Sequence, residues 1–207
     1  ATVPYSYFYL DNLKAVWRKD SPSEITWKTS LRLDICEILL CTNTPPSQVQ
    51  ESIFHKYDSF LKSHLQKAIR RKKVKPALYT ADLLLSWNPL QLLRRLTVIM
   101  VEDAWLSESF PTLLWLMCAL SKGYVMRKEQ KEYVLGVVYL LVTGYEVEIL
   151  PERYYGKELV WYKELEKVHV MSEEESTLLY SLRVRSLFGG LKGDIAMFQA
   201  FWVAYLD

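Results

Sequence analysis

Hydrophobic residues recur along most of the chain at intervals of three and four positions, which is the spacing of one face of an α-helix. Proline and glycine divide this pattern into segments, because proline fits the first turn of a helix and glycine often follows the last. The pattern predicts eight main helices, over residues 24–40, 44–71, 77–87, 90–105, 112–122, 128–142, 173–188 and 195–206. We therefore expect an all-α protein, a compact multi-helix domain of about eight helices.

Three further segments carry weaker patterns. The aromatic segment 4–19 alternates at its start as a strand would, but its second half favours a helix, and we expect a helix. Residues 145–156 indicate an irregular connector, with a short strand as the alternative, and residues 157–167 a short polar helix. One domain over residues 1–207 would then comprise N-terminal helices in 1–61, a central core in 62–144, and a connector with helices in 145–207.

Capping residues mark several of the expected helix starts. Asn88 precedes Pro89, and Gln91 stands where a capping box requires it. Ser172 and Glu175 form the same box before the helix 173–188. The long helix 44–71 begins at a Thr-Pro-Pro sequence, and its apolar face is formed by Val49, Ile53, Tyr57, Phe60, Leu61, Leu65 and Ile69.

The composition indicates a folded protein without a membrane span. Half of the 207 residues are hydrophobic and 14% are aromatic, which is ample core material and argues against disorder. Two of the longest uncharged stretches, 109–121 and 133–145, have 13 residues each, fewer than the roughly 18 to 20 that a bilayer requires. The first 20 residues lack the pattern of a signal peptide. We expect no contact with a membrane.

Residues suited to metal binding or catalysis are scattered. Cys36, Cys41 and Cys118 form no CxxC pair, and the three histidines form no HExxH motif, so we expect neither a disulfide nor a metal site. Phosphate-binding glycine motifs and GxSxG are absent. The sequence therefore predicts a protein that is not an enzyme, with no cofactor and no small-molecule substrate. Unpaired cysteines are typical of an intracellular, reducing compartment, nuclear or organellar if the source is eukaryotic.

Positive charge is concentrated in one segment. The net charge is only +2, yet residues 62–75 hold seven Lys or Arg and no Asp or Glu, whereas the other 193 residues hold 19 basic and 24 acidic residues. Such a density of cations attracts nucleic-acid phosphates. The candidate nucleic-acid-binding residues are Lys67, Arg70, Arg71, Lys72, Lys73 and Lys75. The alternative is a solvated helix end whose charge complements the helix dipole or faces an acidic partner.

A second cationic group lies near the glycines of the C-terminal region. Arg183, Arg185 and Lys192 stand close to Gly189, Gly190 and Gly193, and together they could form a second ligand surface. The alternative is an ordinary turn between helices, with Asp194 as the cap and the cations in solvent.

Four charged residues of the segment 90–105 are expected to have a structural role. Arg94, Arg95, Glu102 and Asp103 lie in one predicted helix, and Arg95 and Glu102 are too far apart to pair directly. We therefore expect each to bind a neighbouring helix, because buried paired charges are kept mainly where they fix geometry. A buried carboxylate pair with a shifted pKa at Glu102 and Asp103 is the functional alternative.

Four short motifs follow one another in a fixed order: Lys67-Ala68-Ile69-Arg70, the segment ALYTADLL at 77–84, Arg94-Arg95-Leu96 and Val101-Glu102-Asp103. Their order and spacing resemble the C-terminal helical region of the replication-associated recombination AAA+ ATPases, over about residues 62–142. This resemblance implies a clamp-loader-like helical collar that mediates oligomerisation in proteins acting at stalled replication forks. Ala104-Trp105 stands where that family has Ile-Gly, and its ATPase and lid domains have no counterpart in these 207 residues.

The sequence therefore predicts a non-catalytic helical adaptor or scaffold subunit of a DNA replication, recombination or repair assembly. It would contact DNA through the basic helix end and would have protein partners or self-associate. The alternative is a purely structural subunit of a large organellar or viral complex without nucleic-acid contact, which the aromatic content favours. An enzyme with an unrecognised site near Glu102 and Asp103 is the third possibility.

Overall fold

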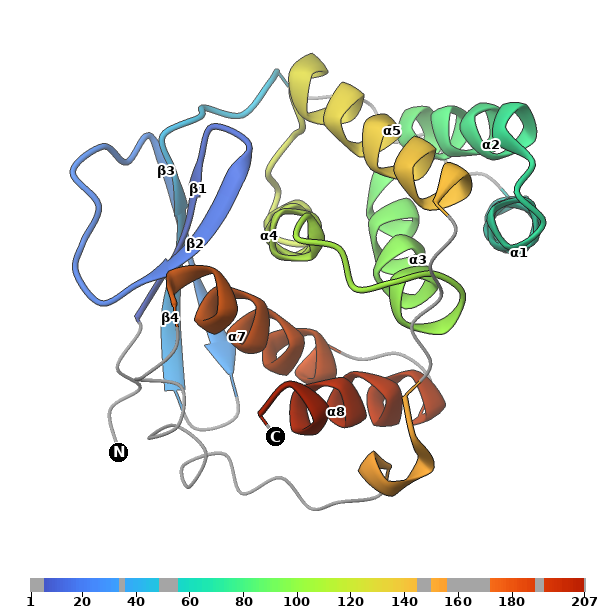
Figure 1. The fold of residues 1–207 in the computed structure, drawn as a ribbon. Helices are drawn as coiled ribbons and strands as arrows, with labels where there is room; N and C mark the ends of the chain where they lie inside the picture. Colours follow the sequence, from blue (N-terminus) through green and yellow to red (C-terminus); the bar gives the residue numbers. More distant parts are fainter. Residues whose placement is uncertain are drawn as a thin grey trace. The chain divides into compact units, whose positions relative to one another are not determined.

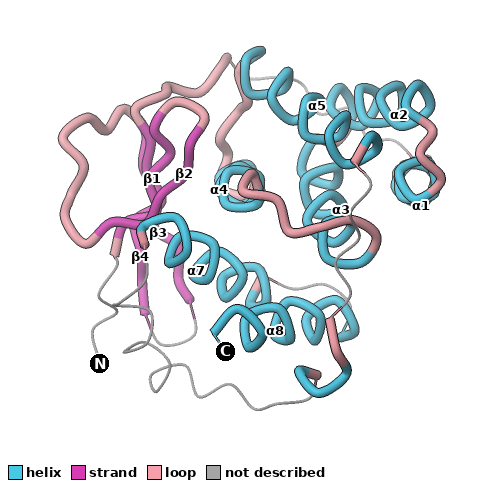
Figure 2. Tube along the Cα trace, viewed as in Figure 1, coloured by secondary structure: helices cyan, strands magenta, loops and turns pink. Residues whose placement is uncertain are grey.

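The computed structural model describes residues 6–33, 36–48, 56–144, 150–155, 172–188 and 192–206 (Figures 1 and 2). The chain forms two compact units, where the sequence predicted one helical domain. The first comprises residues 1–45, 110–115 and 149–207, and the second comprises residues 46–109 and 116–148. One helix, α4 (Phe110–Leu120), contributes its first half to the first unit and its second half to the second.

The prediction of an all-α fold is wrong. The first unit contains a four-stranded sheet, and the fold is α/β, with seven α-helices and this sheet among the described residues (Figure 2). The strands are β1 (Tyr7–Asp11), β2 (Lys14–Arg18), β3 (Trp27–Leu33) and β4 (Cys36–Thr42). They replace the helices expected over 4–19 and 24–40.

The sheet is mixed, in the order β2-β1-β4-β3. β1 pairs antiparallel with β2 and parallel with β4, and β3 pairs antiparallel with β4. Asn12 turns the chain between β1 and β2 with a φ of 56°, a left-handed conformation that asparagine adopts more readily than most residues. Asn12 and Leu13 are the two residues of this hairpin turn, and Asn12 was the turn signal that the helical interpretation overlooked.

The segment 24–40 was misread because its apolar residues fit two periods at once. Trp27, Leu31 and Ile38 have helical spacing, but in the structure the side chains of β3 alternate between the two faces of the sheet. Lys28, Ser30 and Arg32 are exposed, whereas Leu31 is buried. The period of two is therefore the one that this segment uses.

Aromatic side chains form the core between the sheet and its helices. The Phe8 and Trp17 rings stack at a centroid distance of 4.6 Å, and Trp17 also contacts Tyr180 of α7 (Glu173–Leu187). The Trp115 indole Nε1 donates a hydrogen bond to the Phe8 carbonyl oxygen at 3.1 Å. α7 packs against β2 and against α8 (Lys192–Leu206), and the short helix η1 (Glu152–Tyr154) packs against α8 (Figure 1).

Two threonines complete the outer edge of β2. The backbone N–H of Ala15 donates to the Thr112 Oγ1 of α4 at 3.2 Å, and the N–H of Trp17 donates to the Thr177 Oγ1 of α7 at 3.3 Å. An edge strand left open presents unpaired amides to other chains, so these hydroxyls both satisfy the amides and protect the edge.

The described part of the second unit is helical. It contains α1 (Asp58–Arg70), α2 (Val74–Trp87), α3 (Pro89–Glu102), α5 (Lys128–Thr143) and the second half of α4. The expected helices 77–87, 90–105 and 128–142 correspond closely to α2, α3 and α5. Among the described residues, no helix is both long and apolar enough to span a lipid bilayer.

The helix starts were predicted unevenly. Asn88 caps α3 by accepting from the Gln91 N–H, and Ser172 and Glu175 form the expected capping box of α7 at 3.0 and 3.2 Å. The long helix 44–71 is wrong in its first part, because residues 44–48 are not helical and α1 begins at Asp58. The segment 145–149 and the expected helix 157–167 lie outside the described residues.

Candidate nucleic-acid interface

The six cations proposed to bind nucleic acid lie on one helical hairpin. Lys67 and Arg70 belong to the last turn of α1, Arg71 to Lys73 form the connection, and Lys75 belongs to the first turn of α2 (Figure 1). All six residues are exposed. The fold therefore brings this charge to one end of α1 and to the start of the helix that follows it.

The connection between α1 and α2 is a Schellman motif. The Lys73 N–H donates to the Ala68 carbonyl oxygen at 2.9 Å and the Lys72 N–H to the Ile69 carbonyl oxygen at 3.0 Å. Lys72 has a φ of 57°, the left-handed conformation that glycine usually supplies at this position. A lysine there costs about 1–2 kcal/mol of backbone strain. Its side chain makes hydrogen bonds that a glycine at this position could not make.

The Lys72 ammonium group ties the hairpin to the end of α5. Its Nζ donates to the carbonyl oxygens of Leu141, at 3.4 Å, and of Gly144. These carbonyls lie at the C-terminal end of a helix, where the backbone carries partial negative charge and positive charge is favourable. Lys72 therefore holds the hairpin in place and has its charge already engaged.

Arg70 is engaged as well. Its guanidinium donates from Nε to Asp103 Oδ1 at 2.7 Å and from Nη2 to Asp103 Oδ2 at 3.2 Å, a two-pronged contact. The hydrogen bond and the negative charge of Asp103 raise the pKa of Arg70 above its ordinary value. This arginine joins the end of α1 to the end of α3.

Lys67, Arg71, Lys73 and Lys75 remain, and we refer to these four as the hairpin cations. Among the described residues, no side chain of the four makes a hydrogen bond or an ion pair. Their side chains are exposed. Two of the six sequence-predicted residues thus have structural partners, and four are available to a ligand.

A buried amide organises the charged residues beneath the hairpin. Gln66 of α1 is 7% exposed, and its Nε2 donates to Glu102 Oε2 and to Asp103 Oδ2, each at 2.7 Å. Its Oε1 accepts from Arg95 Nη1 at 2.8 Å. One glutamine therefore bridges Arg95 and Glu102, which are seven residues apart and do not pair directly. Both carboxylates accept hydrogen bonds that fix α3 against α1.

Lys62, the first cation of the basic segment, faces α3. Its Nζ donates to the Gln91 Oε1 at 2.9 Å. Burial lowers the pKa of Lys62, and the nearby positive charge of Arg95 lowers it further. Arg94, the fourth residue of the expected structural set, is half-buried on the same helix. Lys62 therefore belongs to the contact between α1 and α3 and lies at the opposite end of α1 from the hairpin cations.

The second cationic group does not form an exposed surface. Arg183 is 8% exposed and Arg185 is 2% exposed, and the Arg185 guanidinium lies 4.6 Å from the centre of the Phe198 ring. Lys192 is exposed at the start of α8. The two arginines are therefore interior residues of the first unit, and they lie on parts of α7 that are buried.

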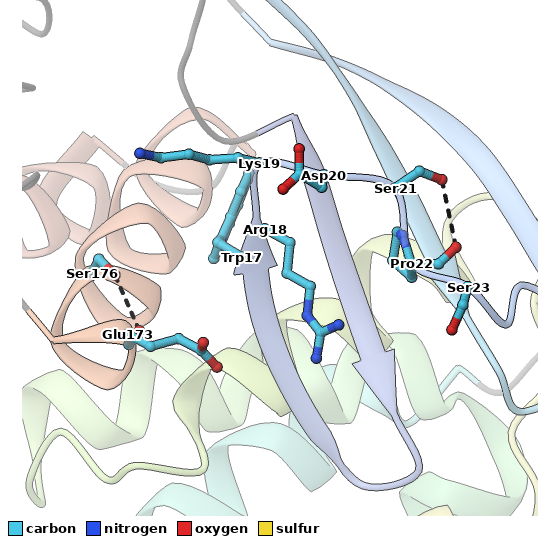
Figure 3. Close-up of a pocket in the computed structure, with 9 residues that line it drawn as sticks. All are labelled: Trp17, Arg18, Lys19, Asp20, Ser21, Pro22, Ser23, Glu173 and Ser176. Carbon is cyan, nitrogen blue, oxygen red and sulfur yellow. Dashed lines mark hydrogen bonds between the residues drawn. The ribbon is translucent and has the colours of Figure 1, made fainter.

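An open cleft of about 530 Å³ lies in the first unit at the end of β2 (Figure 3). Its lining residues are Trp17, Arg18, Lys19, Asp20, Ser21, Pro22, Ser23, Glu173 and Ser176. Figure 3 shows the side chains of Arg18 and Lys19 pointing in different directions, and the Ser176 hydroxyl donates to backbone carbonyls of its own helix. The charged side chains of this cleft do not point toward one position, and we assign no catalytic or ligand-binding role to the cleft.

The sequence interpretation placed two aromatic residues wrongly. Tyr57 and Phe60 were assigned to the apolar face of the first long helix, but they are 53% and 68% exposed. Tyr79, within the motif 77–84, is 69% exposed on α2. The signal that could have found Phe60 was its spacing of seven and eleven residues from Lys67 and Arg71, which puts it on their face of the helix.

In comparisons with known proteins, no protein family, curated protein or solved structure matches this chain.

Proposed function

We propose that this protein is a non-catalytic adaptor that binds nucleic acid through the hairpin cations, as part of an assembly that maintains DNA. The observation that carries the proposal is the exposure of four cations within nine residues, at the end of α1 and the start of α2, which form no ion pair with any residue that the structure describes. A polyanion with regularly spaced charges releases counterions when it meets such a surface.

The structural partners of the hairpin support this proposal. Lys72 and Arg70 hold the hairpin to α5 and α3, so the four remaining cations are presented on a braced element. Side chains held by a rigid scaffold lose less freedom when they bind a ligand. The contacts of Lys72 and Arg70 distinguish the hairpin from a flexible basic tail, whose cations would have no fixed position.

The adaptor part of the proposal rests on the helices of the second unit. The motifs that resemble the recombination ATPase collar fall on α1, α2 and α3, which pack against one another. On α5, Tyr139 and Leu140 are 49% and 56% exposed, and aromatic residues are enriched where proteins meet. A protein partner or a second copy of the chain would fit this role.

The test is a salt titration of binding by the whole chain, using fluorescence anisotropy with labelled single-stranded and duplex DNA of equal length. The test variant reverses all four hairpin cations: Lys67→Glu, Arg71→Glu, Lys73→Glu and Lys75→Glu. Each phosphate contact contributes about 0.7 to the salt slope on a single strand and about 0.9 on a duplex. We expect the variant to lose most of the affinity and most of the slope.

A matched variant with the same change of net charge controls for long-range electrostatics. It carries Lys28→Glu, Arg32→Glu, Lys122→Glu and Lys192→Glu, all at exposed positions outside the hairpin. The proposal requires this control to keep its salt slope. An equal loss in both variants, or no loss in the hairpin variant, would show that the hairpin is not the binding surface, and absence of binding by the unaltered protein would favour the purely structural alternative.

A further inference from the structure

The hairpin presents aromatic rings together with its cations. Phe60 and Tyr79 are 68% and 69% exposed, more than any other large hydrophobic side chain among the described residues. Phe60 lies on α1, and Tyr79 lies on α2. Lone exposed hydrophobic residues are common and need no explanation, so their meaning depends on what surrounds them.

On each helix the ring shares a face with hairpin cations. Along α1, Phe60, His64, Lys67 and Arg71 follow one another at intervals of four, three and four residues, and all are exposed. Along α2, Lys75 and Tyr79 are four residues apart, which places them on one face as well. Both stripes therefore combine positive charge with a planar ring.

The two stripes meet where α1 contacts α2. The Phe60 and His64 rings stack with an interplanar angle of 19° and a centroid distance of 6.3 Å. His64 Nδ1 lies 2.8 Å from the Thr80 Oγ1 of α2, the residue that follows Tyr79. His64 thus holds Phe60 on the side of α1 that faces α2, and the two stripes border one contact between the helices.

We infer that the hairpin binds single-stranded nucleic acid, with bases stacking on Phe60 and Tyr79 while the hairpin cations contact the phosphates. This inference rests on the function proposed above and names its ligand more closely. A duplex keeps its bases stacked inside and offers only phosphates to such a surface, whereas a single strand offers both. An acidic protein segment would engage the cations but has no regular series of planar groups for the rings.

The test separates stacking from charge with three ligands of equal length: a thymidine oligonucleotide, the same sugar–phosphate chain without bases, and a DNA duplex. The variant Phe60→Ala with Tyr79→Ala removes both rings and no charge. We expect each ring to contribute about five-fold or more to affinity for the thymidine oligonucleotide. Binding of the abasic chain and of the duplex, and the salt slope on every ligand, should be unchanged.

Two further variants make the result specific to the rings. Phe60→Tyr with Tyr79→Phe keeps both rings and should bind as the unaltered protein does. Tyr155→Ala with Leu187→Ala removes an exposed ring and an exposed aliphatic side chain from the first unit, outside the hairpin, and should leave binding unchanged. Circular dichroism of each variant shows whether it remains folded, and Phe60 and Tyr79 are exposed enough that their truncation should leave the fold intact.

Each outcome decides between the two claims. If the alanine variant binds the thymidine oligonucleotide as well as the unaltered protein does, or loses affinity equally for the abasic chain, stacking is excluded. If charge reversal of the hairpin cations still abolishes binding in that case, the proposed function stands without the stacking. If charge reversal has no effect either, both the function and this inference fail.

Discussion

The two units of this protein keep their arginines and lysines in opposite environments. In the first unit, Arg183 and Arg185 are buried on α7, and Arg185 lies against the Phe198 ring. In the second unit, the hairpin cations are exposed and make no ion pair among the described residues. Both groups look alike in the sequence, as closely spaced cations in helical segments. Cations mark a ligand surface only where the fold leaves them in solvent and without partners.

The two units also differ in net charge. The second unit holds 14 Lys or Arg and 10 Asp or Glu, a balance of +4, whereas the first holds 12 and 14, a balance of −2. A polyanion is therefore attracted to one unit and weakly repelled by the other. The small net charge of +2 for the whole chain conceals this difference.

The units also differ in how they satisfy buried polar groups. The first unit uses threonine hydroxyls to complete the edge of a strand, and the second uses one glutamine to join three charged side chains. The first arrangement protects a sheet, and the second fixes the helices that carry the proposed interface. Substitutions that remove the threonine hydroxyls and substitutions that remove the glutamine amide should therefore destabilise different parts of the protein.

The largest effect is expected from Trp115→Ala in the first unit. Trp115 is fully buried, and its indole donates to the Phe8 carbonyl oxygen. Loss of the ring should cost about 3–5 kcal/mol of unfolding free energy through the lost burial and the cavity left behind. Urea denaturation followed by circular dichroism measures this cost. Trp115→Phe, which keeps most of the ring but loses the hydrogen bond, should cost less, and equal costs would mean that the hydrogen bond dominates.

A smaller loss is expected from Gln66→Leu in the second unit. The substitution removes the amide that donates to Glu102 and Asp103 and accepts from Arg95. The loss of these hydrogen bonds to charged, partly exposed side chains should cost about 1–3 kcal/mol, again measured by urea denaturation. Gln66→Met, which is closer in shape, should give a similar loss if hydrogen bonding is the cause. If both variants are as stable as the unaltered protein, water replaces the amide and the network does not stabilise the helices.

Thr112→Val and Thr177→Val compare the two hydroxyls at the edge of β2. Thr112 accepts from the Ala15 N–H and donates to the Leu13 carbonyl oxygen, whereas Thr177 accepts from the Trp17 N–H. We expect Thr112→Val to cost about 1–2 kcal/mol and Thr177→Val about 1 kcal/mol. Thermal unfolding of the two variants side by side measures the difference. The opposite order would mean that the two amides are not equally shielded from water.

The helices of the second unit could be predicted from the sequence, because α2, α3 and α5 each present a single period and have a proline or a polar residue near their start. The sheet could not be predicted in the same way. The apolar residues of 24–40 fit a period of 3.6 as well as a period of 2, and the parallel contact between β1 and β4 depends on residues 32 positions apart, such as Tyr7 and Leu39.

The candidate interface was predicted only in part. A count of cations identified the segment, but it could not show that Arg70 pairs with Asp103 or that Lys72 reaches the end of α5, because both partners are distant in the sequence. Nor could it show that Phe60 points into solvent. An apolar residue at helical spacing belongs to the core or to the surface according to which neighbouring helix covers it.

The smallest effect is expected from substitutions of Lys72, whose ammonium group binds the end of α5 and which is not one of the four hairpin cations. Lys72→Ala and Lys72→Gly both remove the contacts to the end of α5, but only glycine relieves the left-handed backbone. The glycine variant should therefore be about 1 kcal/mol more stable than the alanine variant in urea denaturation. Because the Lys72 ammonium is already engaged, Lys72→Ala should reduce the salt slope of DNA binding less than Lys73→Ala does. Equal reductions would show that Lys72 leaves α5 to contact the ligand, and the hairpin would then have five available cations in place of four.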